Sequence, residues 1–379
     1  MYIPQKQVLS TESYTILNNI RTSIGGEFMA ATPLVQNAQD ATAYGLYVTG
    51  SGETRNAFMS ELINRIGKVM VDTKMYTNSL KRFKRGMLEV GEMVENVWVG
   101  LVSPEGYTHS VTTPGDLYKT NKPDCKVTFH PVNSKLFYEV TTNESELQMA
   151  FTSTTGAYDL VSRIVSRLLD SSEWDEFIKF KYVIARAILE NSSAVKTIPT
   201  LNASNSDVVL TSMKTVSNEM EYMSTDYNVA SVPTHTDKSG QVFMVSAAAS
   251  AIFDVNSLAS AFNLSYKDFM GQKQGINTFG FSEIEIKRLN TIMNETAAQG
   301  LIPNYTPFTE AELDKLEGVK AAIIDEDFFM IFDRLIQTEA VYDARHLNTN
   351  NYLHIWQVLS FNPFANSVFF SDYVAPVTP

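Results

Sequence analysis

The sequence predicts an α+β fold organised around one long helix, and two kinds of periodicity support this prediction. From Gly156 to about Glu190, apolar residues recur every three or four positions, which is typical of a helix with one buried face. Such a helix has about 35 residues and a length of roughly 50 Å. Elsewhere apolar and polar residues alternate, as at residues 125 to 130 and 136 to 141, which indicates strands. Helices and antiparallel strands mixed along one chain are an α+β pattern.

The N-terminal part begins with a predicted helix over residues 11 to 24, which Gly25 and Gly26 end. Residues 27 to 54 are mostly small and polar, and they show no sustained period. A compact domain rarely contains an irregular loop of this length. We therefore expect an extended arm that lies on its own chain or on a neighbouring one. A second helix is expected over residues 53 to 67.

The next part of the chain looks like a long two-stranded excursion that leaves the body and returns. Strand-like segments at residues 93 to 102 and 125 to 130 flank a stretch rich in Pro, Gly, Thr and Lys. An isolated hairpin is marginally stable in water, so this excursion needs a partner surface.

After the long helix, helical and strand-like segments alternate. The predicted elements are a helix over 207 to 224, strands over 241 to 246 and 319 to 324, a turn at 325 to 327, a return strand over 328 to 332, an almost wholly apolar strand over 352 to 359 and a last strand through 368 to 370. A strand without polar alternation is typical of one that is covered on both faces.

Composition excludes several classes of protein. The 379 residues are 44% hydrophobic and carry a net charge of −12, which argues against a nucleic-acid binder with a basic face. No apolar run approaches the roughly 20 residues that span a bilayer, so we expect no membrane contact. The single cysteine, Cys125, and the absence of an apolar signal segment favour a cytosol-like compartment.

No catalytic, cofactor-binding or metal-binding constellation is found. The five histidines lack metal-ligand spacing, and neither a phosphate-binding loop nor a nucleophile elbow occurs. Asp325, Glu326 and Asp327 could form a carboxylate cluster for a divalent ion, but a solvated turn explains them better. His354 lies in an apolar strand, where a satisfied core or interface histidine is the simplest interpretation.

The charge feature that stands out is Lys81, Arg82, Lys84 and Arg85, four cations within five residues. Three interpretations remain open: a solvated basic turn, a contact with an acidic neighbouring subunit, and a nucleic-acid contact. The acidic balance of the chain favours the second over the third. An arm, an excursion and an apolar strand that all need partners are typical of an assembly subunit.

Several stretches resemble the major capsid protein of small short-tailed phages of the phi-29 and picovirus type. The similar segments extend over nearly the whole chain and keep their order and spacing. They include residues 11 to 21, Arg65-Ile66-Gly67, Leu80-Lys81-Arg82-Phe83-Lys84-Arg85-Gly86, and His354-Ile355-Trp356-Gln357-Val358-Leu359-Ser360 followed by Phe364-Ala365-Asn366.

The resemblance implies the Hong Kong 97 capsid fold and a domain map. The map has an N-terminal arm (1–54), a helix of the peripheral (P) domain (55–69), an extended E-loop (70–130), the P domain with its spine helix at 156–190 (131–194), the axial (A) domain (195–334) and the closing strands of the P domain (335–379). Some relatives carry an additional immunoglobulin-like domain, which we do not expect after Pro379. No Lys–Asn pair for covalent cross-linking is identified.

The resemblance also implies a function. We expect a non-enzymatic shell subunit that forms pentamers and hexamers, is assembled in the host cytoplasm with scaffolding and portal proteins, and encloses double-stranded DNA in an icosahedral or prolate virion. Lys81, Arg82, Lys84 and Arg85 would contact a neighbouring subunit. Two alternatives are an encapsulin-like nanocompartment shell of the same fold and a soluble enzyme with an unrecognised site.

Overall fold

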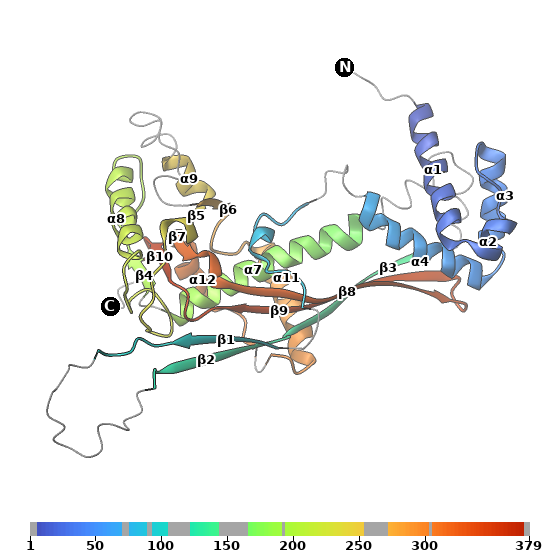
Figure 1. Ribbon diagram of the computed structural model, residues 1–379. Coiled ribbons are helices and arrows are strands. Elements are labelled where there is room, and N and C mark those ends of the chain that lie inside the picture. The colour runs from blue at the N-terminus through green and yellow to red at the C-terminus, as the bar shows by residue number, and fades with distance from the viewer. Residues whose placement is uncertain are drawn as a thin grey trace, which may run out of the picture. The chain divides into compact units, whose positions relative to one another are not determined.

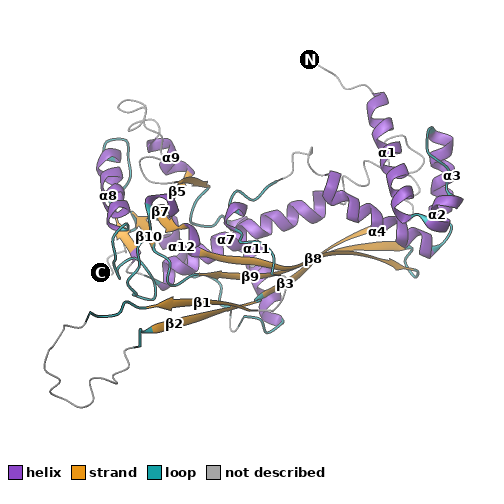
Figure 2. Cartoon of the chain, viewed as in Figure 1, coloured by secondary structure: helices purple, strands orange, loops and turns teal. Residues whose placement is uncertain are grey.

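The computed structural model describes residues 6–69, 76–88, 93–104, 122–143, 166–191, 194–253, 272–302 and 305–374 (Figure 1). Figure 2 shows that helices and strands are mixed along the chain, in agreement with the predicted α+β class. The helices are α1 (Lys6–Ile24), α2 (Gly26–Ala31), α3 (Ala38–Thr49), α4 (Gly52–Val69), α7 (Ser171–Glu190), α8 (Ser206–Glu219), α9 (Ala247–Phe253), α11 (Glu283–Ala298) and α12 (Glu310–Glu317). The strands are β1 (Met93–Val99), β2 (Cys125–Pro131), β3 (Ser134–Asn143), β4 (Val195–Thr197), β5 (Gln241–Ser246), β6 (Gln272–Ile276), β7 (Val319–Asp325), β8 (Phe329–Asp343), β9 (Asn348–Phe361) and β10 (Ser367–Ser371).

The long helix is observed in its C-terminal part. A π-helical turn at Ser166–Asp170 leads directly into α7, which ends at Glu190 as expected. Residues 156–165 of the predicted helix lie outside the described residues, as do residues 105–121 of the predicted E-loop. The described part of α7 buries apolar side chains such as Ile178, Phe180 and Ile184, which explains why its three-and-four spacing is visible in the sequence.

The chain divides into two compact units, and the first comprises Met1–Asn78, Lys135–Glu176 and Leu335–Trp356. Our expectation of an extended arm over residues 27 to 54 was wrong, because α2, α3 and the start of α4 occupy this segment. Asn37 caps α3 by accepting hydrogen bonds from the amides of Gln39 and Asp40. Tyr44 and Val48 of α3 then enter a shared core, so burial of a few large side chains overrides a weak local pattern. The core members are Leu17, Ile20, Phe28, Val35, Ala41, Tyr44, Val48, Phe58, Met59, Leu168 and Leu353.

The second unit comprises Ser79–Ser134, Phe177–Arg334 and Gln357–Pro379. It contains a five-stranded sheet in the order β4-β10-β7-β5-β6, in which β7 pairs antiparallel with both β5 and β10. Every residue of β5 and of β10 is buried. Val209, Met213 and Val216 of α8 belong to the same core cluster as Phe243 of β5, and this packing covers one face of the sheet.

The strand after the acidic turn differs from our prediction. We expected residues 328 to 332 to return beside the strand at 319 to 324, but β8 instead joins a three-stranded sheet of order β3-β9-β8. A 3-10 turn at Glu326–Phe328 redirects the chain between the two sheets. β8 and β9 both continue from one compact unit into the other. Within the described residues, none of the helices is both long enough and apolar enough to cross a membrane.

Candidate functional site: the root of the β1–β2 hairpin

The predicted excursion is an antiparallel hairpin of β1 and β2 that pairs with no other described strand (Figure 1). Its two faces differ because directly opposed residues share a face. On the inner face the indole of Trp98 donates a hydrogen bond to the carbonyl of Pro233 (3.4 Å), and Lys126 Nζ donates to the carbonyl of Ala230 (3.1 Å). The hairpin therefore rests on its own unit through this face.

The outer face of the hairpin is exposed and largely apolar. Its cross-strand pairs include Val97 opposite Val127, and Phe129 opposite Glu95. Val97 is 52% exposed and Phe129 is 59% exposed. Met93 and Val99 of β1 are exposed on the same face. Contiguous exposed apolar area of this kind marks an interaction surface.

Hydrogen bonds hold both ends of the hairpin to the second unit. We call residues 84–88 the N-terminal leg and residues 130–133 the C-terminal leg, and together with their partners on β8 and β9 they form the hairpin root. In the N-terminal leg, the amide of Leu88 donates to the carbonyl of Asp333 (2.7 Å), and the amide of Asp333 donates to the carbonyl of Gly86 (3.0 Å). Gly86 has φ +104°, which a residue with a side chain rarely adopts. The leg thus runs along β8 in a conformation that requires glycine.

The C-terminal leg is held by side chains. Asn133 donates from Nδ2 to the carbonyl of Leu359 (2.7 Å) and accepts from the amide of Leu359 (2.8 Å), so its amide group replaces a peptide in a strand pair. His130, 4% exposed, shares a hydrogen bond of 2.8 Å with the hydroxyl of Ser360. Burial lowers the pKa of His130 below its usual value, because the charged imidazolium is poorly solvated there.

A buried polar chain connects the N-terminal leg to α7. Lys84 Nζ lies 2.7 Å from Asp333 Oδ2, while the other carboxylate oxygen of Asp333 accepts from Gln357 Nε2 (2.9 Å). Gln357 Oε1 in turn accepts from Lys179 Nζ of α7 (3.0 Å). Gln357 is 1% exposed, Lys179 is 2% exposed and Asp333 is 7% exposed. Such a chain is stabilising because each buried polar group has a partner.

The structure shows which groups the predicted cations contact. Lys84 and Arg85 pair within the chain, Lys84 with Asp333 and Arg85 with Asp327 (2.5 Å), and Arg85 Nε also donates to a backbone carbonyl on β8. Lys81, Arg82 and Arg85 are all exposed residues, and Arg82 Nη1 donates a hydrogen bond to Gln272 Oε1 (3.4 Å). Sequence reasoning singled out the cations but missed their anchors, since nothing local marks Asp333.

A second ion pair fastens α11 to α7. Lys181 Nζ lies 3.1 Å from Glu285 Oε2, and both side chains are almost fully buried. Burial lowers the pKa of Lys181, against the attraction of Glu285. Burial alone would raise the pKa of Glu285, but the hydrogen bond from the Ser282 amide and the charge of Lys181 outweigh it and hold that pKa below its usual value.

The acidic turn at residues 325 to 327 is held together by hydrogen bonds. Asp325 accepts from the amide of Asp327 (2.8 Å) and from the hydroxyl of Thr236 (2.6 Å). Burial raises the pKa of Asp325 despite these hydrogen bonds. In the part of the chain that the structure describes, no three His, Cys, Asp or Glu side chains are grouped to hold a metal ion. His354 is half-buried and stacks on Tyr352.

Comparison with known proteins identifies the family. Residues 17–371 match the Phi29-like phage major capsid protein family. The chain is 31% identical to the major capsid protein of Bacillus phage GA-1 over 367 residues, which cover 96% of this chain and 70% of that protein. It is 23% identical to the major capsid protein of Streptococcus phage Cp-1, covering 93% of this chain and 92% of that protein.

Solved structures agree in fold at low sequence identity. The chain is similar to a chain in the structure of the head fibre and inner core protein gp22 of bacteriophage P68, with a TM-score of 0.60, 12% identity, and coverage of 80% of this chain and 86% of that chain. The capsid structure of Staphylococcus phage Andhra gives a TM-score of 0.57 at 11% identity, with coverage of 80% and 86%. These similarities confirm the Hong Kong 97-type capsid fold. The chain therefore belongs to the family of Phi29-like phage major capsid proteins, and it is a structural component of the virion capsid, not an enzyme.

Proposed function

We propose that copies of this chain assemble into pentamers and hexamers that form the shell of a phage head around double-stranded DNA. Residues 195–334 would act as the A domain and residues 70–130 as the E-loop. Residues 1–54, which include the helices α1, α2 and α3 and are not an extended segment, would act as the N-terminal arm. Scaffolding and portal proteins would take part in assembly. The net charge of −12 supports a shell wall that does not bind the enclosed DNA tightly.

One observation carries this proposal for assembly: the outer face of the β1–β2 hairpin has no described partner surface within the chain. Met93, Val97, Val99, Val127 and Phe129 are each between 42% and 59% exposed on this face. A stable interface needs such an apolar centre, whereas exposed ion pairs contribute only about 0–1 kcal/mol each. A neighbouring copy of the chain would cover this face.

We propose that the basic segment at residues 81 to 85 contacts a neighbouring subunit, with different roles for its cations. The carboxylates of Asp333 and Asp327 hold Lys84 and Arg85, and the exposed Lys81 and Arg82 lie next to them in the same segment, where they would reach a neighbouring subunit. All four residues remain in the proposed contact region, with Lys84 and Arg85 positioning the segment.

The test is a comparison of Val97→Asp with Val97→Thr. Both variants should fold like the parent, because Val97 is half exposed and surface substitutions usually change stability by about 0.5 kcal/mol or less. The aspartate places a charge at the centre of the apolar face and should prevent shell formation, while the threonine keeps the shape and should reduce it only slightly. Shells of Val97→Asp at the parent's yield in electron micrographs would contradict the proposal.

A further inference from the structure

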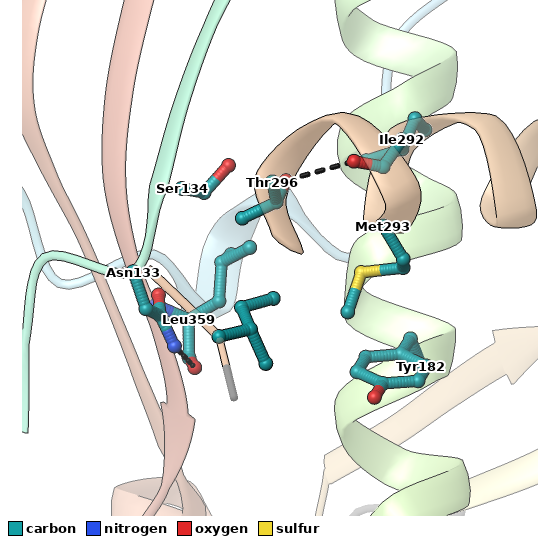
Figure 3. A pocket seen from close by; sticks show the side chains of 8 residues that line it. Asn133, Ser134, Tyr182, Ile292, Met293, Thr296 and Leu359 are labelled. Atoms are coloured by element: carbon teal, nitrogen blue, oxygen red, sulfur yellow. Dashed lines mark hydrogen bonds between the residues drawn. The ribbon is translucent and has the colours of Figure 1, made fainter. Parts of the chain in front are cut away.

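A pocket of about 80 Å³ adjoins the C-terminal leg of the hairpin root, and the proposed assembly does not use it (Figure 3). Asn133 and Ser134 line one wall, Leu359 of β9 lies beside them, and Tyr182 of α7 and Met293 of α11 line the opposite side. The Lys181–Glu285 ion pair joins the two helices that contribute to this opposite side. The pocket is therefore framed by fixed elements.

The lining is mainly apolar and contains one unused polar group. Ser134 is 1% exposed, and its hydroxyl has no hydrogen-bond partner among the described residues. The other polar side chains are engaged: Thr296 donates to the carbonyl of Ile292 (2.8 Å), and Asn133 is bonded to Leu359. Figure 3 shows the Ser134 hydroxyl directed toward the helix that carries Thr296. A buried hydroxyl without a partner destabilises the folded chain, so a ligand that accepts its hydrogen bond gains affinity.

Size and polarity together define the class of ligand. None of the described residues that line the pocket is charged, so an ion would be poorly solvated there. A buried water needs two to four polar partners, and the lining side chains offer one that is unused. Dry apolar cavities of about 150 Å³ in other proteins bind benzene, so a pocket of about half that volume suits a molecule with fewer heavy atoms than benzene. We propose that this pocket binds a small uncharged molecule with an apolar body and one oxygen that accepts a hydrogen bond from Ser134.

Binding here would act on the hairpin root. The occupant would pack against Asn133 and Leu359, the two residues that hold the C-terminal leg through hydrogen bonds of 2.7 Å and 2.8 Å. A ligand that binds only while the Asn133–Leu359 hydrogen bonds are formed shifts the equilibrium toward the state in which they are formed. The effect on shell formation rests on the proposed function, whereas binding itself does not.

The test uses butanone and its hydrocarbon counterpart 2-methyl-1-butene, in which a methylene group replaces the oxygen. The purified subunit carries a ¹³C label in its methionine methyl groups, and the Met293 signal, assigned through Met293→Leu, reports on the pocket. We expect a saturable shift with a Kd of about 1 mM for butanone, as the size of the ligand allows. Ser134→Ala should weaken butanone about fivefold and leave 2-methyl-1-butene unchanged.

Ser134→Val fills the space and should abolish the shift with both compounds. It also removes the unpartnered hydroxyl, so a raised Tm would show that the variant is folded. The binding proposal is overturned if the parent gives no saturable shift up to about 100 mM butanone, far above the expected Kd, or if Ser134→Val leaves the shift intact. If Ser134→Ala lowers the affinity for both compounds equally, the proposed hydrogen bond to Ser134 is overturned. Shell yield is measured separately, with and without butanone. An unchanged yield at saturation overturns only the proposed action on the hairpin root. A failure of binding leaves the Val97 test of the proposed function unaffected.

Discussion

The Lys84–Asp333 ion pair should stabilise the hairpin root more than the Arg85–Asp327 pair beside it. The two cations are adjacent in sequence, but the two pairs differ in solvation. Lys84 and Asp333 are 14% and 10% exposed, whereas Arg85 and Asp327 are 30% and 71% exposed. The perturbation is a pair of double-mutant cycles, one with Lys84→Met and Asp333→Asn, and one with Arg85→Met and Asp327→Asn.

The magnitudes follow from burial. Breaking a fully buried pair by removing one partner destabilises by about 3–5 kcal/mol. In the Asp333→Asn variant the new amide side chain would keep a hydrogen bond to Gln357 but present its donors to Lys84. Because the pair is slightly exposed, we expect a loss of about 2–3 kcal/mol, below the range for a fully buried pair. The coupling energy of the buried cycle should be about 1–3 kcal/mol. That of the Arg85–Asp327 cycle should stay below about 1 kcal/mol, because water screens Asp327.

Urea unfolding of the purified subunit, followed by circular dichroism, gives the free energies of unfolding for each cycle. Hydrogen exchange at the amide of Leu88, which donates to Asp333, reports on the root itself. The Asp333→Asn variant should lose protection there while the five-stranded sheet keeps its own. Coupling energies that agree within about 0.5 kcal/mol would refute the argument that burial separates the two pairs.

Three further predictions concern single contacts. Because burial lowers the pKa of His130, the folded chain favours the neutral imidazole. The free energy of unfolding is therefore unaffected by His130 protonation above its pKa of about 6.5 in the unfolded chain, and it decreases as the pH falls below that value toward the lower pKa in the folded chain. Unfolding at pH 7 and pH 5 should therefore show a smaller acid destabilisation in His130→Gln, and an equal loss would contradict the assignment. Lys181→Met should destabilise by about 3 kcal/mol in thermal unfolding, since it leaves the buried Glu285 charged and unpaired, and adding Glu285→Gln should restore part of the loss; no recovery in the double variant would argue against the ion pair. Asn37→Ala should destabilise by about 1 kcal/mol by removing the cap of α3, with Gln36→Ala as the control, and equal effects of the two changes would exclude the cap.

Elements with a continuous or strictly periodic apolar pattern could be predicted from the sequence. β5 spans Gln241–Ser246 as expected, and α4 at Gly52–Val69 overlaps the helix predicted over 53 to 67. In these segments the buried face belongs to consecutive local positions, so the pattern is visible in a short window. α3 was missed because Ala41, Tyr44 and Val48, which carry much of its described buried face, stand in a segment without a sustained apolar period.

The hairpin root could not be predicted from local pattern. Asn133 and Leu359 are 226 positions apart, and neither residue type is unusual where it stands. Asp333 carries no signal beyond an acidic residue in an apolar strand, and Gln357 could equally have been a solvated glutamine. Their roles arise from strands β8 and β9 meeting the hairpin in space. Similarity to a known family identified the fold, while the contacts that position the hairpin required the structure.

The amide of Gln357 lies between an ammonium group and a carboxylate, with its oxygen toward Lys179 and its nitrogen toward Asp333. Glutamate at this position would repel Asp333, and lysine would place a second cation beside Lys179. Methionine would remove the hydrogen-bond donor to Asp333 and the acceptor for Lys179. Only a side chain with an acceptor and a donor on one planar group, at this reach, satisfies both neighbours. Saturation mutagenesis should accordingly find this position intolerant, although it takes part in no chemistry.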